Sequence, residues 1–384
     1  MLPELAWLFF RLGATGLGGP AAHIAMMEDE VVGRRRWLTR EQFLDFLGAA
    51  NLIPGPNSTE MAIHIGYLRA GWPGLIVAGA CFIVPAVILV TCIAWAYVRF
   101  GSLPQVSAIL YGVKPVVIAI VAQAMWHLAR TAVKTKALGL IGAASAGCAL
   151  AGIGALPILA AAGAVAGFRE WLWQGQRRIA TAPALAGIAT AVLLAQSAPA
   201  AVSSHQPAAP GTSALFLYFL KVGSVLYGSG YVLLAFLQRD LVGQWRWLTS
   251  RQLLDAVAVG QITPGPVFTT ATFVGYILTG LPGAFAATAG IFLPSFFFCA
   301  ISGPLVPRLR RSRVAGAFLD GVNVASLALM AAVAWELGRA ALVDVFTVLT
   351  ALASALVLFR YRVNSVWLIL GGALLALALS WRSL

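Results

Sequence analysis

The residues best suited to chemistry in this 384-residue chain surround two Pro-Gly-Pro tripeptides. The tripeptides are Pro54, Gly55 and Pro56 in the first half and Pro264, Gly265 and Pro266 in the second. Proline removes a backbone donor and disfavours helix before it, so a helix must stop at each tripeptide and restart after it. The restarting helix turns unpaired N–H groups and its positive dipole end toward the break. This predicts an anion site; the alternative is a kink held by packing.

Polar side chains that can donate hydrogen bonds to an anion follow both breaks. The predicted anion-binding residues are Asn57, Ser58 and Thr59 after the first break, and Thr269 and Thr270 after the second. The Pro-Gly-Pro tripeptide recurs in register with these hydroxyl groups, which favours a binding role over a simple kink.

Cationic side chains inside apolar segments are the next candidates, because a buried charge is costly in lipid and suggests a partner or a substrate. Lys114 lies ten residues from either neighbouring loop and is the best single candidate for countering the charge of an anion. Its counterpart in the second half, Asn323, is predicted to join the same substrate site. Arg11 and Lys221 occupy matching places in the two halves and are predicted to bind substrate, the alternative being that they extend to the membrane surface.

Four acidic or titratable side chains are candidates for proton coupling. Glu60 and His64 are four residues apart just after the first break, a spacing that suits either proton uptake during transport or an ordinary hydrogen-bonded pair. Asp45 and Asp255 occupy matching positions on short helices, where they could instead hold Arg36 or Arg246 or cap the structure.

The elements that must position these residues are short, interrupted helices. A helix over 41–53 would be about 20 Å long at 1.5 Å per residue, which reaches the middle of a bilayer without crossing it. A second short helix is predicted over 57–70, and the segments 252–262 and 267–280 repeat the design. We therefore expect a discontinuous or re-entrant helix pair at each break.

The chain repeats itself. Residues 9–56 align with 219–266 at a constant offset of 210, and 16 of the 48 aligned pairs are identical. After one deletion the offset becomes 209, which pairs Gly74 with Gly283 and Pro85 with Pro294. This predicts a membrane repeat over 1–178, a connecting transmembrane segment and linker over 179–212, and a second repeat over 213–384.

Composition places the chain in a membrane. The sequence is 60% hydrophobic and 10% charged, whereas soluble domains carry about 25% charged residues. Uncharged runs such as 70–98 and 256–307 are long enough for at least one crossing each. The formal charge of +13 collects in short loops, as expected of cytoplasmic loops, so we predict lipid contact and no nucleic-acid partner. The fold class is therefore an all-α polytopic membrane protein.

The loop charges also predict how the two halves are oriented. Arg308, Arg310, Arg311 and Arg313 form a basic loop in the second half, where the matching loop of the first half holds only Arg99. Because basic loops stay in the cytoplasm, the halves are predicted to be inverted relative to each other, joined by an extra crossing near 182–202.

Several segments that contain the residues described above resemble the chromate ion transporter family in its long, two-domain form. The matching stretches include FFRLGATGLGG, NLIPGPNSTEMAIHIGYLRAGWPG, FLKVGSVLYGSG, GQITPGPVFTTATFVGY and the paired YGVK and DGVN. The resemblance implies a multi-pass protein of the bacterial inner membrane that exports chromate, coupled to an ion gradient. Another anion, such as sulfate or an organic acid, is the alternative substrate.

The sequence carries no nucleotide-binding fingerprint and no hydrolase or metalloprotease motif. We therefore expect a transporter rather than an enzyme, with no catalytic residues, no metal and no cofactor. A small inorganic anion is the predicted substrate, and a second copy of the chain is a candidate partner.

Overall fold

The computed structural model describes residues 1–16, 19–50, 53–101, 103–173, 210–227, 232–361, 363 and 365–380. The predicted connecting crossing near 182–202, and nearly all of the linker that follows it, lie outside these residues. Every regular element among the described residues is helical. In the first half these are α1 (Leu2–Thr15), α2 (Gly19–Glu28), η1 (Asp29–Arg34), α3 (Arg40–Ala50), α4 (Asn57–Phe100), α5 (Pro104–Ala132), α6 (Lys136–Leu150) and α7 (Ala155–Trp173).

The second half repeats this succession, with a short 3-10 helix, η4, added before its long helix. Its elements are α9 (Thr212–Val225), α10 (Leu233–Phe236), η3 (Leu237–Gln244), α11 (Ser250–Ile262), η4 (Val267–Thr269), α12 (Thr270–Arg311), α13 (Arg313–Ala341), α14 (Val345–Tyr361) and α15 (Ser365–Ser380). Thus α1 corresponds to α9, α4 to α12, and α5 to α13.

Five of the described helices are long and apolar enough to cross a membrane. They cover Asn57–Phe100, Val106–Ala132, Ala155–Trp173, Val267–Ile301 and Arg313–Ala341. Large apolar side chains, among them Ile76, Ile88 and Phe297, remain exposed on the outside of these helices. An apolar outer surface on long helices is what lipid requires, so the chain is an all-α polytopic membrane protein.

The predicted short helices after each break are present, although each continues into a longer one. Helix α4 is interrupted at Ala70 and Gly71, where Gly71 has a φ of +60°, and α12 is interrupted at Thr279 and Gly280, where Gly280 has a φ of +70°. The piece of α4 before its interruption spans about 20 Å, which is less than the roughly 30 Å core of a bilayer. Each Pro-Gly-Pro break is therefore flanked by two half-length helices, as predicted.

The two halves repeat fine geometrical details as well as sequence. Arg36 and Arg246, which the repeat aligns, are the two non-glycine residues with positive φ in the described chain, at 52° and 53°. Both arginines precede a helix start capped by a threonine, and in each case the helix returns a glutamine to the backbone of that threonine. The caps are Thr39 with Gln42 and Thr249 with Gln252. The local fold is therefore set by the same signals twice.

Two aligned glycines let the first helix of each half approach the long helix of the same half. A Cβ atom on Gly13 would lie 2.3 Å from the Phe82 carbonyl oxygen, and one on Gly223 would lie 2.4 Å from that of Ile291. Glycine allows this close approach because it has no side chain. Helices α1 and α9 thus pack tightly on α4 and α12.

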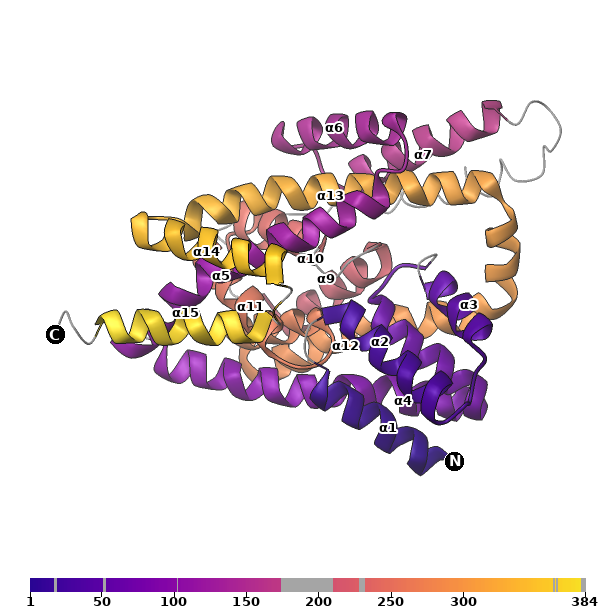
Figure 1. Ribbon diagram of the computed structural model, residues 1–384, viewed down its shortest axis with the longest axis horizontal. Helices are drawn as coiled ribbons and strands as arrows, with labels where there is room; N and C mark the ends of the chain where they lie inside the picture. Colours follow the sequence, from indigo (N-terminus) through magenta and orange to yellow (C-terminus); the bar gives the residue numbers. More distant parts are fainter. Residues whose placement is uncertain are drawn as a thin grey trace.

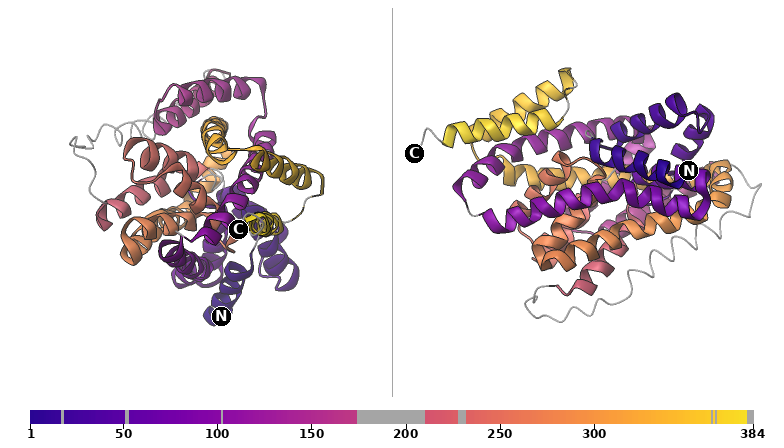
Figure 2. Two further views of the ribbon diagram at one scale, coloured as in Figure 1. Left: turned by 90° about the vertical axis from the view of Figure 1, so that its left-hand side faces the viewer. Right: turned by 90° about the horizontal axis from the view of Figure 1, so that it is seen from below.

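The last two helices of each half pack on the other half. Helices α6 and α7 lie against α13, and α14 and α15 lie against α5 (Figures 1 and 2). Polar contacts also join the two halves: the Tyr111 hydroxyl donates to Asp344, and Lys134 forms a 2.7 Å ion pair with Asp320. The halves are therefore interlocked rather than merely side by side.

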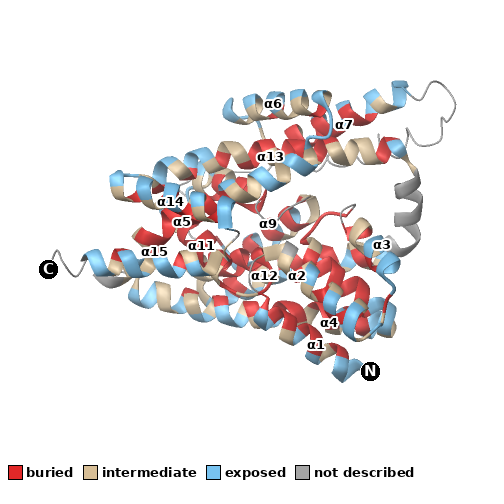
Figure 3. Ribbon diagram, viewed as in Figure 1, coloured by how far each residue is buried: buried red, intermediate tan, exposed pale blue. Residues whose placement is uncertain are grey.

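Burial is greatest where the halves meet. The central region around α9, α11 and α12 is mostly buried, whereas α6, α14 and α15 present exposed faces outward (Figure 3). The largest buried cluster joins residues of α4, α5 and α7 to residues of α9, α11, α12 and α13. The core thus belongs to both halves, and the breaks lie within it.

Candidate functional site

Each Pro-Gly-Pro break is bound to the end of the first helix of the opposite half. The Gly55 N–H donates to the Leu226 carbonyl oxygen at 2.8 Å, and the Gly265 N–H donates to that of Gly16 at 3.0 Å. Leu226 and Gly16 are aligned by the repeat, so the two hydrogen bonds are reciprocal. Both break glycines have positive φ, 141° and 92°. The two breaks therefore lie in the interface between the halves, held in a backbone conformation that favours glycine.

Each break also contacts the long helix of the opposite half. A Cβ atom on Gly55 would lie 2.5 Å from the Ser295 hydroxyl oxygen of α12, and one on Gly265 would lie 2.7 Å from the Ala86 Cβ of α4. Ser295 and Ala86 are equivalent in the repeat and each follows a proline. The first break thus faces a hydroxyl group where the second faces a methyl group.

Unpartnered buried polar atoms gather at the first break. Thr59 Oγ1, both carboxylate oxygens of Glu60, His64 Nε2 and Ser295 Oγ have no hydrogen-bond partner. All four side chains are buried, and that of Glu60 is fully buried. The Glu60 carboxylate folds back on the break, since a Cβ on Gly55 would lie 2.2 Å from its Oε1. Leaving so many buried groups unsatisfied is costly, so this cluster is suited to bind a proton or a ligand.

The hydrogen-bonded alternative for Glu60 and His64 is wrong, because neither carboxylate oxygen of Glu60 has a hydrogen-bond partner. The His64 ring instead stacks on Phe46 of α3, with the ring centroids 5.6 Å apart. The spacing of the two residues on one helix is as expected, yet their side chains serve different contacts.

The second break is closed by its own threonines. The Thr269 hydroxyl donates to the Pro266 carbonyl and the Thr270 hydroxyl to the Val267 carbonyl, both at 2.8 Å. The segment that follows this break, 267–275, contains no acidic residue. Only the first of the two breaks therefore combines a carboxylate with unsatisfied hydroxyl groups.

The backbone contributes less to these sites than the sequence suggested. The Thr59 and Glu60 N–H groups donate to the Pro56 carbonyl at 2.8 and 3.1 Å, and the Thr269 N–H donates to the Pro266 carbonyl at 3.0 Å. These N–H groups close the first helical turn, so they do not point at an anion. Side chains, rather than helix ends, distinguish the first break.

A second buried cluster joins the two halves through charge. Lys114 of α5 forms a 3.1 Å ion pair with Asp255 of α11, and the Tyr97 hydroxyl of α4 donates to the other oxygen of Asp255 at 2.9 Å. The Lys114 and Asp255 side chains are 10% and 1% exposed. The expectation that Asp255 holds Arg246 or Arg36 is wrong, since its partner is Lys114 from the other half.

Arg11 and Lys221 face acidic residues rather than the breaks. Arg11 pairs with Glu30 of η1, and the charge of Lys221 acts on Asp240, which the repeat aligns with Glu30. Both cations are far less buried than Lys114. Arg11 therefore has an acidic partner, and Lys221 has an acidic residue near it at the equivalent position.

The other candidates lie at differing depths. Asn57 is half-buried at the start of α4, whereas Ser58 is buried. Asp45 is exposed on α3, and Asn323 is half-buried on α13.

Three residues near these clusters were missed at the level of sequence, and two of them, Tyr97 and Cys299, carried no signal of their own. Tyr97 and Cys299 lie far along α4 and α12, and the Cys299 thiol is 3.9 Å from the Glu60 carbonyl oxygen. For Ser295 there was a usable signal, because it follows Pro294, which the repeat aligns with Pro85.

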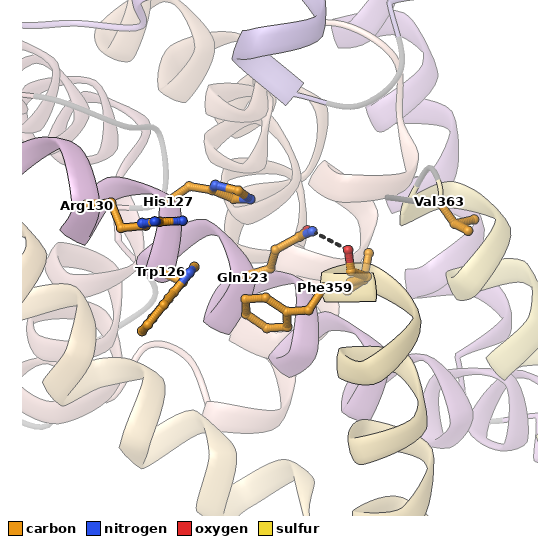
Figure 4. Close-up of a pocket in the computed structure, with 7 residues that line it drawn as sticks. Gln123, Trp126, His127, Arg130, Phe359 and Val363 are labelled. Carbon is orange, nitrogen blue, oxygen red and sulfur yellow. Dashed lines mark hydrogen bonds between the residues drawn. The ribbon is translucent and has the colours of Figure 1, made fainter. Parts of the chain in front are cut away.

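A cavity of about 500 Å³ lies between α5 and α14 (Figure 4). Its wall includes a 3.0 Å hydrogen bond from the Gln123 amide to the Leu358 carbonyl. Gln123 is nine residues beyond Lys114, about 14 Å along the helix. Trp126, His127 and Arg130 of this cavity are exposed, so it opens on the outer surface rather than at a break. The lining residues are Gln123, Trp126, His127, Arg130, Leu358, Phe359 and Val363.

These features define a multi-pass membrane protein with two broken-helix elements and two buried polar clusters at the interface of its halves. The sequence model of the family described as Chromate transporter matches residues 3–168 and 213–377, which is most of each half. The chain belongs to the chromate transporter family, a family of membrane transporters.

Curated relatives agree with this assignment. The chain is 32% identical to the chromate transport protein of Cupriavidus metallidurans over 375 residues, which covers 97% of this chain and 92% of the relative. It is 32% identical to the probable chromate transport protein of Synechococcus elongatus over 362 residues, 91% of this chain and 88% of that protein. The chromate transport protein of Pseudomonas aeruginosa is 31% identical over 344 residues, 88% of this chain and 81% of its own. The chain is a multi-pass protein of the bacterial plasma membrane. No solved structure matches it.

Proposed function

We propose that this protein is a secondary transporter that exports chromate across the plasma membrane and is coupled to an ion gradient. The observation that carries the proposal is the buried polar cluster at the first break, where Glu60 and its neighbours lack partners. A chain that only spans the membrane would gain nothing from these unsatisfied groups. Relatives that align over most of the chain are named as chromate transport proteins, which supports chromate as the anion.

The buried cluster also supports coupling to protons. An ionised Glu60 beside the break would repel a dianion, whereas a protonated Glu60 could donate a hydrogen bond to it. Ser295 and Thr59 offer further hydroxyl donors at the same place. Proton uptake at Glu60 would then accompany anion binding and release.

Sulfate or an organic acid remains the alternative substrate, because sulfate has the same tetrahedral shape and charge as chromate. The hydroxyl and lysine groups described above contain nothing that selects chromium over sulfur. Competition between the two anions is therefore expected at the same site.

Transport by purified protein tests the proposal. The protein is reconstituted in liposomes, and uptake of chromate and of sulfate is followed with and without a pH gradient. We expect chromate uptake that depends on the gradient and is inhibited by excess sulfate. If neither anion moves under any gradient, the oxyanion proposal fails. Liposomes with a heat-inactivated sample serve as the control.

A further inference from the structure

One buried ion pair links the two halves and lies apart from the first break. Lys114 Nζ and Asp255 Oδ1 are 3.1 Å apart, on α5 of the first half and α11 of the second. The Tyr97 hydroxyl donates to Asp255 Oδ2, so one carboxylate oxygen is held by a hydroxyl group and the other faces only the lysine. This geometry leaves Oδ1 dependent on Lys114 for compensation of its charge.

The surroundings of Asp255 offer it little else. Helices α4, α5, η3, η4, α12, α13 and α15 pack around α11, and η4 carries no titratable side chain. Arg251 lies one turn earlier on α11 and is exposed. The Glu336 carboxylate of α13 accepts a hydrogen bond from the Gln238 amide at 3.1 Å. Helix α15 carries no charged residue between Ser365 and Ser380. The remaining titratable groups on these elements, with α12 taken only as far as Ile301, are Glu60, His64, Tyr67, Arg69, Cys81, Cys92 and Arg99 on α4, Tyr111, His127 and Arg130 on α5, Arg239 and Asp240 on η3, Tyr276 and Cys299 on α12, and Arg313, Asp320 and Arg339 on α13.

An anion that binds Lys114 must compete with the Asp255 carboxylate. A buried charge that loses its partner is strongly unfavourable, and a carboxylate in that position is neutralised by binding a proton. Binding of the anion and binding of the proton are then linked, because each favours the other.

We propose that Lys114 and Asp255 form a coupling switch in which an oxyanion takes the place of Asp255 on Lys114 while Asp255 binds one proton. The proton comes from water on the loading side and binds Asp255 Oδ1. When the anion leaves, the proton also leaves, and the ion pair re-forms. This inference rests on the proposed function, because it assumes that the transported ligand is an oxyanion.

The repeat indicates that the switch is present once per chain. The positions equivalent to Lys114 and Asp255 hold Asn323 and Asp45, and Asp45 is exposed on α3. A neutral amide and an exposed carboxylate cannot form the same buried ion pair. The switch therefore contributes one proton for each anion.

Asp255→Asn tests the switch because an amide cannot take up the proton. Chromate binding to purified protein is measured at alkaline pH values, where chromate is a dianion and does not itself titrate. One linked proton raises the wild-type Kd about tenfold for each pH unit. We expect Asp255→Asn to lose this tenfold dependence and to keep only the pH dependence that proton uptake at Glu60 contributes.

The matched control is Asp320→Asn, which neutralises the exposed cross-half ion pair with Lys134. It should keep the wild-type pH dependence. Lys114→Gln removes the cation and should weaken chromate binding at least about tenfold at every pH. A wild-type pH dependence in Asp255→Asn, or unchanged affinity in Lys114→Gln, overturns the switch.

A direct proton measurement on the wild type does not depend on the folding of any variant. Chromate is added to unbuffered protein that contains a pH indicator, and the switch requires at least about one proton bound for each anion. Binding without proton uptake refutes the switch while leaving the proposed function intact. If the wild type binds and transports neither chromate nor sulfate, the proposed function itself fails.

Discussion

Glu60 is the residue at which the candidate site departs most from a simple membrane helix. Its side chain is fully buried, and neither carboxylate oxygen has a hydrogen-bond partner. Glu60→Gln removes the charge while keeping the shape, so we expect it to stabilise the fold by about 1–3 kcal/mol. The same variant should lose gradient-driven transport. Thermal unfolding in detergent and liposome uptake measure the two effects.

The control for Glu60 is Glu41→Gln, which changes an exposed carboxylate at the start of α3. It should leave both the unfolding temperature and transport at the wild-type level. A Glu60→Gln variant that is less stable than the wild type would show that the carboxylate has a stabilising partner in solution.

Glu30 gives a pH dependence that can be checked outside the membrane spans. Burial by itself raises the pKa of Glu30, but hydrogen bonds and charges from Arg11, Arg35 and Arg34 together lower it. A lowered pKa means that the ionised form stabilises the fold above the unfolded value of about 4.3. This contribution is lost as the pH falls through the lowered pKa.

Glu30→Gln is therefore expected to cost about 1–3 kcal/mol at neutral pH and to lose less stability than the wild type on acidification. Unfolding temperatures measured from neutral pH down to acid pH provide the test. Asp29→Asn is the control, because the Asp29 and Arg34 side chains are 60% and 66% exposed and such surface pairs contribute little. Parallel acid profiles for the wild type and Glu30→Gln would contradict the prediction.

Residue types could be predicted from the sequence better than their partners. The spacing of Glu60 and His64 suited either proton uptake or a hydrogen-bonded pair, and the apolar surroundings of Lys114 indicated a buried cation. The partner of Lys114 could not be predicted, because Asp255 lies 141 positions away in the other half and the repeat aligns it with Asp45 instead. A repeat reveals equivalent positions, whereas an ion pair between non-equivalent positions leaves no periodic signal.

At the scale of elements, the Pro-Gly-Pro breaks depend on glycine. Gly265 has a φ of 92°, and an added Cβ would lie 2.7 Å from that of Ala86 and 3.1 Å from the Gly13 carbonyl oxygen. We expect Gly265→Ala to destabilise the protein by more than about 2 kcal/mol, through backbone strain and overpacking. Thermal unfolding in detergent measures the loss.

Gly316→Ala is the matched control, because Gly316 lies inside α13 with open space around its Cα. The same substitution should there stabilise the helix by up to about 1 kcal/mol. Equal effects at the two positions would mean that the break has no special need for glycine.

The half-length helices could be predicted because proline and glycine act locally. Helix boundaries near Ile262 and the interruption at Gly71 both fall close to the expected positions. The packing of the last two helices of each half on the other half could not be predicted. All four helices, α6, α7, α14 and α15, are apolar, and their sequences do not specify which long helix they cover. Packing across the whole molecule decides that choice.

At the scale of the whole molecule, the packing of helices from each half on the other half makes the fold of each half depend on the other. Helices α6 and α7 cover α13, α14 and α15 cover α5, and the largest buried cluster contains residues of both halves. The proposed repeats, 1–178 and 213–384, are therefore expected to act as one unit around the breaks. Motion of one half against the other would change the reciprocal contacts of Gly55 and Gly265 together.

Those reciprocal contacts require the halves to be related by an approximate two-fold rotation, and the loop charges predict that its axis lies in the membrane plane. With that axis, equivalent positions lie on opposite sides of the membrane. We expect cysteines placed at 99 and at 308 to react with an impermeant maleimide from opposite sides.

The labelling is done in intact cells and in inverted vesicles, in a chain whose four cysteines, Cys81, Cys92, Cys148 and Cys299, are replaced by serine. A second equivalent pair, at 130 and 339, is the internal control. Position 130 should react from the side opposite to 99, and position 339 from the side opposite to 308. Position 308 should react in inverted vesicles, since the basic loop that contains it is predicted to be cytoplasmic. Reaction of 99 and 308 from the same side would place the two-fold axis along the membrane normal and would refute inversion.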